Sequence, residues 1–405
     1  MEPVKLEVVT PTIQSLMKLS AVKRTETAIR TAYRSFDKMS NKSHEKLFQF
    51  CFKNMHWSVF EHHYLTVKVP KEISSEARFD AFTEELNPDF IRIFRNCKKY
   101  DVFKGNVRSF MDLWKSLITQ FTYCFSQKAK LQQSKNYSDY ETFCKTMKYA
   151  TEVFQKNVHA SGYRNQFIEY CAAIHIATYI LNNAFKNMKF AEHCFAEIHS
   201  NKYLDLLENL PKIKVEQDME YFTVRVVADI AVGREWLRHT PLRGVTQEST
   251  RYCSYQNKGF RVASPVPFEY ADYLEDFAEG KVYFLERRED IPTNRAIAVK
   301  LYQAYYNAFS SYNALIEMGL PPQQARAVLP LGTIGEFVIT GHWTNWAHFC
   351  KMRCAKDAHP QIRYLAKKIR NYFERNLSPE QWKYFLRIEK GCDLVTSSSF
   401  CKSKG

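Results

Sequence analysis

Two short segments of alternating polarity, far apart in the chain, constrain the fold more than any other feature of this sequence. Residues 64–69 (YLTVKV) place Leu65, Val67 and Val69 on one face. Residues 222–226 (FTVRV) resume the same pattern more than 150 residues later. A period of two residues is typical of a strand with one buried face. The sequence therefore predicts strands on both sides of a long intervening segment.

The intervening segment has a different character. Residues 110–125 and 140–190 are aromatic-rich, show a helical period and carry almost no strand signal, and the mixed charges of residues 212–220 are typical of a linker. This change of pattern gives four predicted parts. They are the N-terminal part of a core (1–69), a helical insertion of unknown role (70–215), the C-terminal part of the core (216–390) and a loose tail (391–405).

Other elements follow from periodicity and from helix-breaking residues. Residues 5–9 (KLEVV) alternate like a short strand. The helices that we expect in the core cover residues 26–36, 44–53, 230–237, 301–315, 343–352 and 360–375.

The chain is strongly basic. Its 405 residues carry a formal net charge of +15, so its partner is expected to be an anion. Nucleic acid, a free nucleotide, a phosphorylated cofactor and an acidic membrane all satisfy that charge, which alone does not choose among them. With 45% hydrophobic and 15% aromatic residues, the chain can build a sizeable core.

Cysteine usage and hydropathy indicate the compartment in which the protein is expected and whether it is expected to contact a membrane. The 11 cysteines include no CxxC pair, so buried thiols of a reducing compartment are expected and a metal site is not. The N-terminal residues show no signal pattern, and the most apolar stretch, residues 170–180, is too short to span a bilayer. We expect a soluble, cytoplasmic protein without a membrane partner.

The densest polar cluster covers residues 234–256 (REWLRHTPLRGVTQESTRYCSYQ). It places four arginines and a histidine around a helix break at Pro241 and Gly244. An anion there could meet the guanidinium of Arg251 and the hydroxyl of Ser249. The plainer alternative is a solvated basic turn.

Two further arginines favour an anion-binding site over a solvated turn. Arg326, in QQARAVLP, and Arg353, in HFCKMRC, lie in apolar surroundings. Burying an unpaired charge is costly, so both are expected to have partners.

Together these segments resemble the flavin-dependent thymidylate synthases. The family signature, Arg-His-Arg followed by Ser-x-Arg, reads RHTPLRGVTQESTRY here. The other segments that resemble the family, in its order, are AIRTAYRSFD (28–37), HWSVFEHHYLTVKV (56–69), MGLPPQQARAVLPL (318–331) and HFCKMRCAKDAHPQIRYLAKKI (348–369). The resemblance implies an α/β (α+β) core, with an antiparallel-leaning sheet flanked by helices, interrupted by the helical insertion.

The resemblance also implies an activity. Such enzymes reductively methylate dUMP to dTMP, with methylenetetrahydrofolate as carbon donor and NADPH reducing a bound FAD. A homotetramer is expected, and no cysteine nucleophile is implied. Ser249 is accordingly interpreted as a nucleotide ligand.

Site residues carry over position by position. Those matching nucleotide contacts are Glu235, Gln247, Glu248, Ser249, Thr250, Arg251, Arg326 and Arg353. Those matching FAD or folate contacts are Ser35, His56, Ser58, Glu61, Arg238, His239, His342 and His348. The catalytic set comprises Arg353, Arg251 and Ser249, with Arg353 expected to stabilise negative charge on the uracil carbonyl. Alternatives stay open for three: His56 as a structural histidine, Glu61 as a helix cap and Ser35 as a turn hydroxyl.

The sequence departs from the family pattern at several positions. Thr240 replaces the third signature residue, usually Arg, and the following loop is one residue longer and carries Arg243. Glu235 stands where Gln is frequent, and a carboxylate there opposes a phosphate unless it turns away or pairs with an arginine. His342 and Thr344 stand where Asn and Arg are commoner. These changes bear on FAD affinity more than on the dUMP site.

Two rival hypotheses remain. One is a catalytically weakened relative that only binds nucleotide. The other is a basic nucleic-acid-binding protein, motivated by Lys98–Lys99 and Lys128–Lys130. The charges of the insertion are nearly balanced, which disfavours nucleic acid as the partner.

Overall fold

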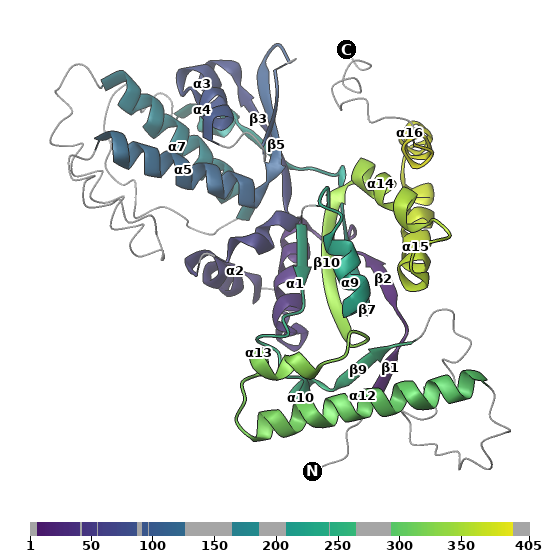
Figure 1. The fold of residues 1–405 in the computed structure, drawn as a ribbon. Coiled ribbons are helices and arrows are strands. Elements are labelled where there is room, and N and C mark those ends of the chain that lie inside the picture. Colours follow the sequence, from purple (N-terminus) through teal and green to yellow (C-terminus); the bar gives the residue numbers. More distant parts are fainter. Residues whose placement is uncertain are drawn as a thin grey trace. The chain divides into compact units, whose positions relative to one another are not determined.

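The computed structural model describes residues 6–40, 43–54, 56–86, 91–95, 97–125, 164–185, 208–242, 244–264 and 293–391 (Figure 1). The chain forms two compact units. Unit 1 comprises residues 1–18, 27–36 and 220–405, and unit 2 comprises residues 19–26 and 37–219.

Unit 1 is built on a four-stranded antiparallel sheet. Its strand order is β2 (Thr12–Ser15), β7 (Tyr221–Asp229), β10 (Ile334–His342) and β8 (Gly244–Gln247). The central strand β10 pairs with β7 along its whole length, and all of its residues but the last are buried. The prediction of an antiparallel-leaning sheet flanked by helices is confirmed.

One face of this sheet packs against helices from the C-terminal half of the chain. They are α9 (Ile230–Leu237), α14 (Trp343–Arg353), α15 (Pro360–Asn376) and α16 (Pro379–Glu389). Trp236 of α9 stacks on Phe349 of α14, with ring centroids 4.3 Å apart. On the opposite face, Val338 contacts Ala28 of α1 (Ala21–Tyr33). Burial of these rings stabilises α9, which ends directly before the signature segment.

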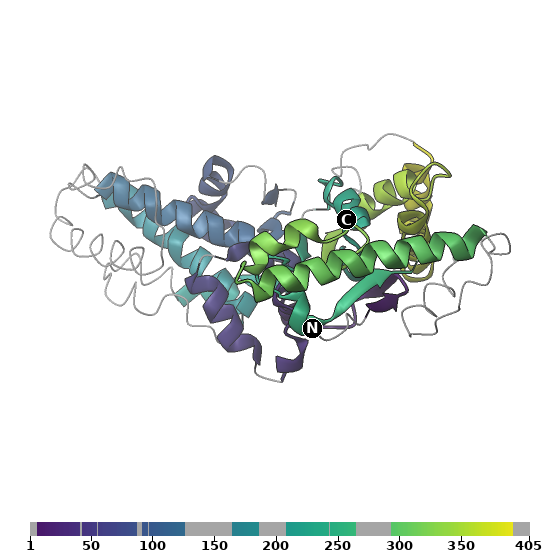
Figure 2. The same cartoon turned by 60° about the horizontal axis from the view of Figure 1, so that its bottom comes forward.

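A smaller sheet completes unit 1. Strands β1 (Leu6–Val9) and β9 (Phe260–Ala263) pair in parallel, and the long helix α12 (Thr293–Glu317) lies along them (Figure 2). Phe260 stacks on Phe309, with centroids 4.4 Å apart. The short elements of this region are α10 (Tyr255–Lys258), α13 (Pro322–Ala325) and η5 (Arg326–Val328).

Unit 2 has its own four-stranded antiparallel sheet. The strand order is β4 (Arg92–Phe94), β5 (Tyr100–Asn106), β3 (Tyr64–Pro70) and β6 (Lys214–Gln217). Helices α5 (Val107–Phe125) and α7 (Arg164–Phe185) pack side by side, where Trp114 Nε1 donates to Thr178 Oγ1 at 3.0 Å. The remaining elements are α2 (Ser43–Lys53), η2 (Trp57–His62), α3 (Lys71–Glu76), α4 (Phe79–Leu86) and η4 (Leu210–Lys212). One of the chain's boundaries between the units, after residue 36, falls inside η1 (Phe36–Lys38).

The segment expected to be almost wholly helical contains strands. Within residues 70–215, β4 and β5 precede α5, and β6 begins at Lys214. Strand β3, predicted for the core, pairs with β5 and β6, so the compact units have boundaries other than those expected from the sequence. In β5, the buried positions include the polar residues Asp101 and Asn106 and the small Gly105 beside Phe103, so the sequence lacks the apolar alternation that marks a strand. Residues 140–163 and 186–190 of the expected helices, and the tail from residue 392, lie outside the described residues.

Among the described residues, no helix is both long enough and apolar enough to cross a membrane.

Candidate functional site

The loop after β8 carries the signature serine, and backbone hydrogen bonds fix its position. The Glu248 N–H donates to the Glu336 carbonyl of β10 at 2.8 Å, and the Ser249 N–H donates to the Ala32 carbonyl of α1 at 3.0 Å. Ser249 Oγ accepts the N–H groups of Arg251 and Tyr252 at 3.2 and 3.3 Å. Because the backbone occupies its acceptor side, the Ser249 hydroxyl keeps its O–H as a donor.

Two arginines of the predicted nucleotide set lie at the same place and brace each other's loops. Arg326 Nη1 donates to Thr250 Oγ1 at 2.9 Å, and Arg251 Nε donates to Gln323 Oε1 at 3.0 Å. Both guanidinium groups are exposed, and both partners are neutral. In the part of the chain that the structure describes, neither arginine forms an ion pair. Their two positive charges therefore remain available to an anion.

Arg353 belongs to a second group, formed with α9. Its Nη1 lies 2.6 Å from Glu235 Oε2, and its Nε donates to His239 Nε2 at 2.9 Å. Glu235 thus pairs with an arginine, which is one of the two arrangements that the sequence left open for its carboxylate. Burial, followed by the charges of Arg353 and His348, lowers the pKa of His239 to about 4. His239 is therefore neutral near pH 7, with Nε2 as acceptor and the proton on Nδ1.

Behind the serine loop lies a network of buried charge, of which only Glu248 has a role predicted from the sequence, as a nucleotide contact. Glu336 Oε2 accepts Arg225 Nε at 3.1 Å, and Glu336 Oε1 lies 3.3 Å from Arg261 Nη2. Glu248 lies 3.6 Å from Arg34 and 3.7 Å from Arg261. Glu248 is only 2% exposed, and burial raises its pKa, against the lowering effect of Arg34 and Arg261. Charged residues inside strands that are otherwise apolar were the available sequence signal.

Among residues matched to flavin or folate, five lie in unit 1. Arg238 follows α9 and is exposed, while His348 on α14 is half-buried. His342 caps α14, with Nδ1 accepting the Thr344 N–H at 3.3 Å and Nε2 lying 3.6 Å from Glu220 Oε2. His239 and Ser35 complete this group, and Ser35 Oγ accepts Arg30 Nη1 at 3.4 Å.

The other three lie in unit 2, in or beside η2. His56 precedes the helix, is exposed and contacts the Phe50 ring, with centroids 6.1 Å apart. Ser58 is exposed, and Glu61 Oε1 lies 3.9 Å from Arg108 Nη1.

The remaining candidate residues from the sequence differ in burial and in whether the structure describes them. Gln247 is half-buried at the end of β8, opposite Phe337, and Thr240 is exposed. Arg243 and Lys128–Lys130 lie outside the described residues. Within those described, no group of three or more His, Cys, Asp or Glu side chains is arranged to hold a metal ion.

The family is decided by a comparison of the whole chain. Residues 168–377, more than half of it, match the family described as thymidylate synthase complementing protein. The chain belongs to this family. The match covers β7 to α15 and so includes all eight residues assigned to the nucleotide.

The residues matched by the family do not have the same boundaries as the core and insertion predicted from the sequence. It begins inside α7, so the family segment extends into the range predicted to be an insertion. Residues 1–69, which entered the resemblance on the motifs at 28–37 and 56–69, lie outside it.

Individual relatives are distant. A flavin-dependent thymidylate synthase of Thermus thermophilus is 30% identical over 173 residues, which cover 42% of this chain and 57% of that one. One of Pseudothermotoga lettingae is 24% identical over 194 residues, covering 47% and 78%. The chain therefore spans little more than half the length of the Thermus protein. A solved UMP/dUMP methylase of Streptomyces cacaoi is 22% identical, covering 38% of this chain and 69% of its own, with a TM-score of 0.29, too low to bear on the fold.

Proposed function

We propose that this protein catalyses the FAD-dependent reductive methylation of dUMP to dTMP, with methylenetetrahydrofolate as carbon donor and NADPH as reductant. The observation that carries the proposal is the brace between Arg251 and Arg326 beside Ser249. Two exposed guanidinium groups whose side-chain hydrogen-bond partners among the described residues are neutral suit a doubly charged phosphate.

The phosphate would be held by three donors. Among the described residues, Arg251 uses only Nε, on Gln323, and Arg326 uses only Nη1, on Thr250, so each guanidinium retains further N–H groups. The O–H of Ser249 adds a neutral donor. Because the serine loop is anchored to α1 and β10, these donors are positioned before the ligand arrives, which lowers the entropy cost of binding.

Arg353 is suited to the other end of the nucleotide. Glu235 and His239 engage its Nη1 and Nε, which fixes the plane of the guanidinium. A neutral His239 orients Arg353 without adding a second positive charge. We expect the remaining nitrogen, Nη2, to stabilise negative charge that develops on a uracil carbonyl oxygen.

The residues of unit 1 also fit an anionic flavin nucleotide. Arg238 offers an exposed cation, and His342 has a donor-capable Nε2 because Nδ1 accepts the Thr344 N–H. FAD, when bound, would supply the hydride chemistry, while the protein binds and orients the reactants. We retain His56, Ser58 and Glu61 as proposed flavin or folate contacts, and propose a homotetramer in the cytoplasm.

The test is anaerobic turnover of labelled dUMP with FAD, NADPH and methylenetetrahydrofolate. We expect dTMP to form with the wild-type chain, to require FAD, and to fall below detection in Arg251→Ala. Absence of dTMP with the wild-type chain, or normal turnover in Arg251→Ala, would contradict the proposal.

A second candidate function follows from the neutral, exposed Thr240 at a signature position that is usually Arg. The chain would then bind nucleotide but hold flavin too weakly for turnover. The visible absorption spectrum separates the two. An active enzyme purifies yellow or takes up added FAD with a spectral shift, whereas the weakened relative shows neither and still binds dUMP.

A further inference from the structure

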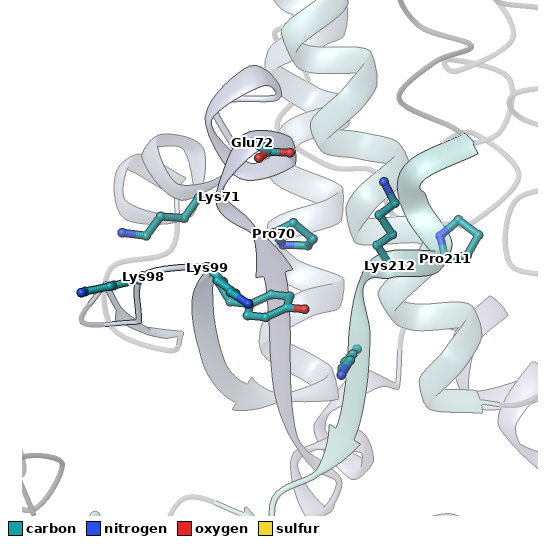
Figure 3. Close-up of a pocket in the computed structure, with 9 residues that line it drawn as sticks. Pro70, Lys71, Glu72, Lys98, Lys99, Pro211 and Lys212 are labelled. Carbon is teal, nitrogen blue, oxygen red and sulfur yellow. The ribbon is translucent and has the colours of Figure 1, made fainter. Parts of the chain in front are cut away.

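Lysines gather around a hollow at one end of the sheet in unit 2 (Figure 3). The hollow has a volume of about 570 Å³, and the lysines that line it are Lys71, Lys98, Lys99, Lys212 and Lys214. We call it the lysine pocket. It lies within unit 2, whereas Arg251 and Arg326 belong to unit 1.

The sheet itself brings these lysines together. Pro70 at the end of β3 pairs with Tyr100 at the start of β5, and the preceding Lys68 pairs with Lys214 of β6. The N–H of Lys71 donates to the Lys99 carbonyl at 3.1 Å, which ties the start of α3 to the segment before β5. Figure 3 accordingly shows Lys71 and Lys98 on one side of Pro70 and Lys212 on the other.

The positive charge of the pocket is poorly neutralised. Glu72 is the one carboxylate among the lining residues. Lys71 Nζ donates to the neutral Arg95 carbonyl at 3.4 Å. The other four lysines are exposed and form no ion pair with any described residue. The five lysine charges repel one another, and the single carboxylate offsets only one of them. An anion bound among the lysines would relieve that repulsion.

The pKa of a neighbouring thiol, that of Cys97, is lowered by the same surroundings. The backbone N–H groups of Lys99 and Tyr100 lower the pKa of the Cys97 thiol, and the charges of Lys71 and Lys68 lower it further. The residues around the hollow therefore already favour a negative charge at this edge of the sheet.

The dimensions and walls of the pocket select the class of ligand. Its volume falls in the range of roughly 300–1,000 Å³ typical of small-molecule sites, and Tyr100 and two prolines give it apolar surfaces. A nucleic acid would instead need a basic track for successive phosphates. We propose that the lysine pocket binds a nucleoside triphosphate, with the phosphate chain among the lysines and the base against Tyr100. This goes beyond the proposed function and does not depend on it.

The test is a fluorescence titration of the full chain with the ATP analogue TNP-ATP. Saturating dUMP is present to occupy the site in unit 1, and the titration is repeated with Arg251→Ala, so that the outcome stays readable if the proposed function fails. The pocket variant is Lys99→Gln/Lys212→Gln. The matched control is Lys367→Gln/Lys383→Gln, which removes two exposed lysines of α15 and α16.

We expect the pocket variant to bind TNP-ATP about tenfold more weakly than wild type, because each lysine removed takes away a charge-assisted hydrogen bond. The control pair should stay within about twofold, since exposed charges outside the pocket are screened by solvent and salt. Lys98→Gln/Lys214→Gln should repeat the loss, and far-UV circular dichroism checks that every variant is folded.

Competition identifies the ligand class. Unlabelled ATP and inorganic triphosphate are expected to displace TNP-ATP at lower phosphate concentration than a single-stranded oligothymidylate. The proposal is overturned if both pocket pairs bind like wild type, if the control pair loses as much affinity as they do, or if the oligonucleotide is the better competitor.

Discussion

Arg353 donates its Nε–H to Nε2 of His239 across 2.9 Å, and this bond fixes both the tautomer and the charge of the histidine. A protonated His239 has no lone pair to offer Arg353. The pair therefore carries one positive charge, which Glu235 balances at 2.6 Å. The group around Arg353 is thus nearly neutral, whereas Arg251 and Arg326 retain their charge, a difference suited to a nucleotide with a neutral base and an anionic phosphate.

Replacing His239 tests its role in orienting Arg353. His239→Gln can keep an acceptor for the Arg353 Nε–H, whereas His239→Leu leaves that donor unpaired. We expect kcat/KM for dUMP to fall about tenfold or more in His239→Leu and several-fold less in His239→Gln, because an unmet hydrogen bond to a charged group costs about 1.5–3 kcal/mol. Steady-state kinetics check this, and equal losses in the two variants would contradict it.

Buried histidines of unit 2 predict a pH-dependent stability. Burial, aided by the charge of Arg24, lowers the pKa of both His62 and His63 to about 3. The unfolded chain takes up protons below its ordinary histidine pKa of about 6.5, while the folded chain does not. The contribution of these histidines to the free energy of unfolding is therefore complete above that pH. It decreases as the pH falls towards 3, by up to about 1.4 kcal/mol per pH unit for each histidine.

Urea denaturation at pH 7 and pH 5 measures this slope. His62→Gln should reduce it, while His359→Gln, which changes an exposed histidine, should leave it as in wild type. A slope that is the same in all three proteins would show that His62 does not set it.

The hydroxyl of Thr250 is expected to matter for nucleotide affinity. Thr250→Val keeps the shape of the side chain but removes the acceptor for Arg326 Nη1, whereas Thr250→Ser keeps the hydroxyl. We expect the Kd for dUMP to rise about threefold to tenfold in Thr250→Val, since a freed arginine must be ordered on binding. It should stay within about twofold in Thr250→Ser. Isothermal titration calorimetry measures both, and an unchanged Kd in Thr250→Val would refute the bracing role.

The buried charge network is expected to be a stability element. Glu336→Gln leaves Arg225 and Arg261 facing a neutral amide in a mostly buried position. We expect the free energy of unfolding to drop by about 3–5 kcal/mol, as when one partner of a buried pair is removed. Glu374→Gln breaks the exposed i, i+4 pair with Arg370 and should cost under about 1 kcal/mol. Similar values from urea denaturation of the two variants would argue against the network.

Local sequence pattern could predict strands with one buried face but not the centre of the sheet. Strands β3 and β7 alternate and were predicted. Strand β10 is buried on both faces, so its residues give no alternation, and it was missed. The short strands β2 and β8 hold their places by pairing with β7 and β10, partners that no local pattern specifies.

In the candidate site, too, the sequence indicated individual residues but not the distant partners that position them. The resemblance to the family led to Arg251, in the signature, and to Arg326, in the segment at 318–331, and the structure places their loops together. It could not indicate that Thr250 and Gln323 hold them, because these contacts join residues more than 70 positions apart. Glu336 was missed for the same reason, since its partner Arg225 lies 111 residues away in the sequence.

The central claim is that Arg251 and Arg326 hold the phosphate of a pyrimidine nucleotide, and calorimetric titration of dUMP against deoxyuridine tests it most directly. The wild-type chain should bind dUMP much more tightly than deoxyuridine. Arg326→Ala should weaken dUMP about tenfold or more, from the loss of a charge-assisted contact, and leave deoxyuridine unchanged, while Arg375→Ala, which removes an exposed arginine of α15, should change neither. Equal affinity of the wild-type chain for the two ligands, or equal weakening of both in Arg326→Ala, would contradict the claim.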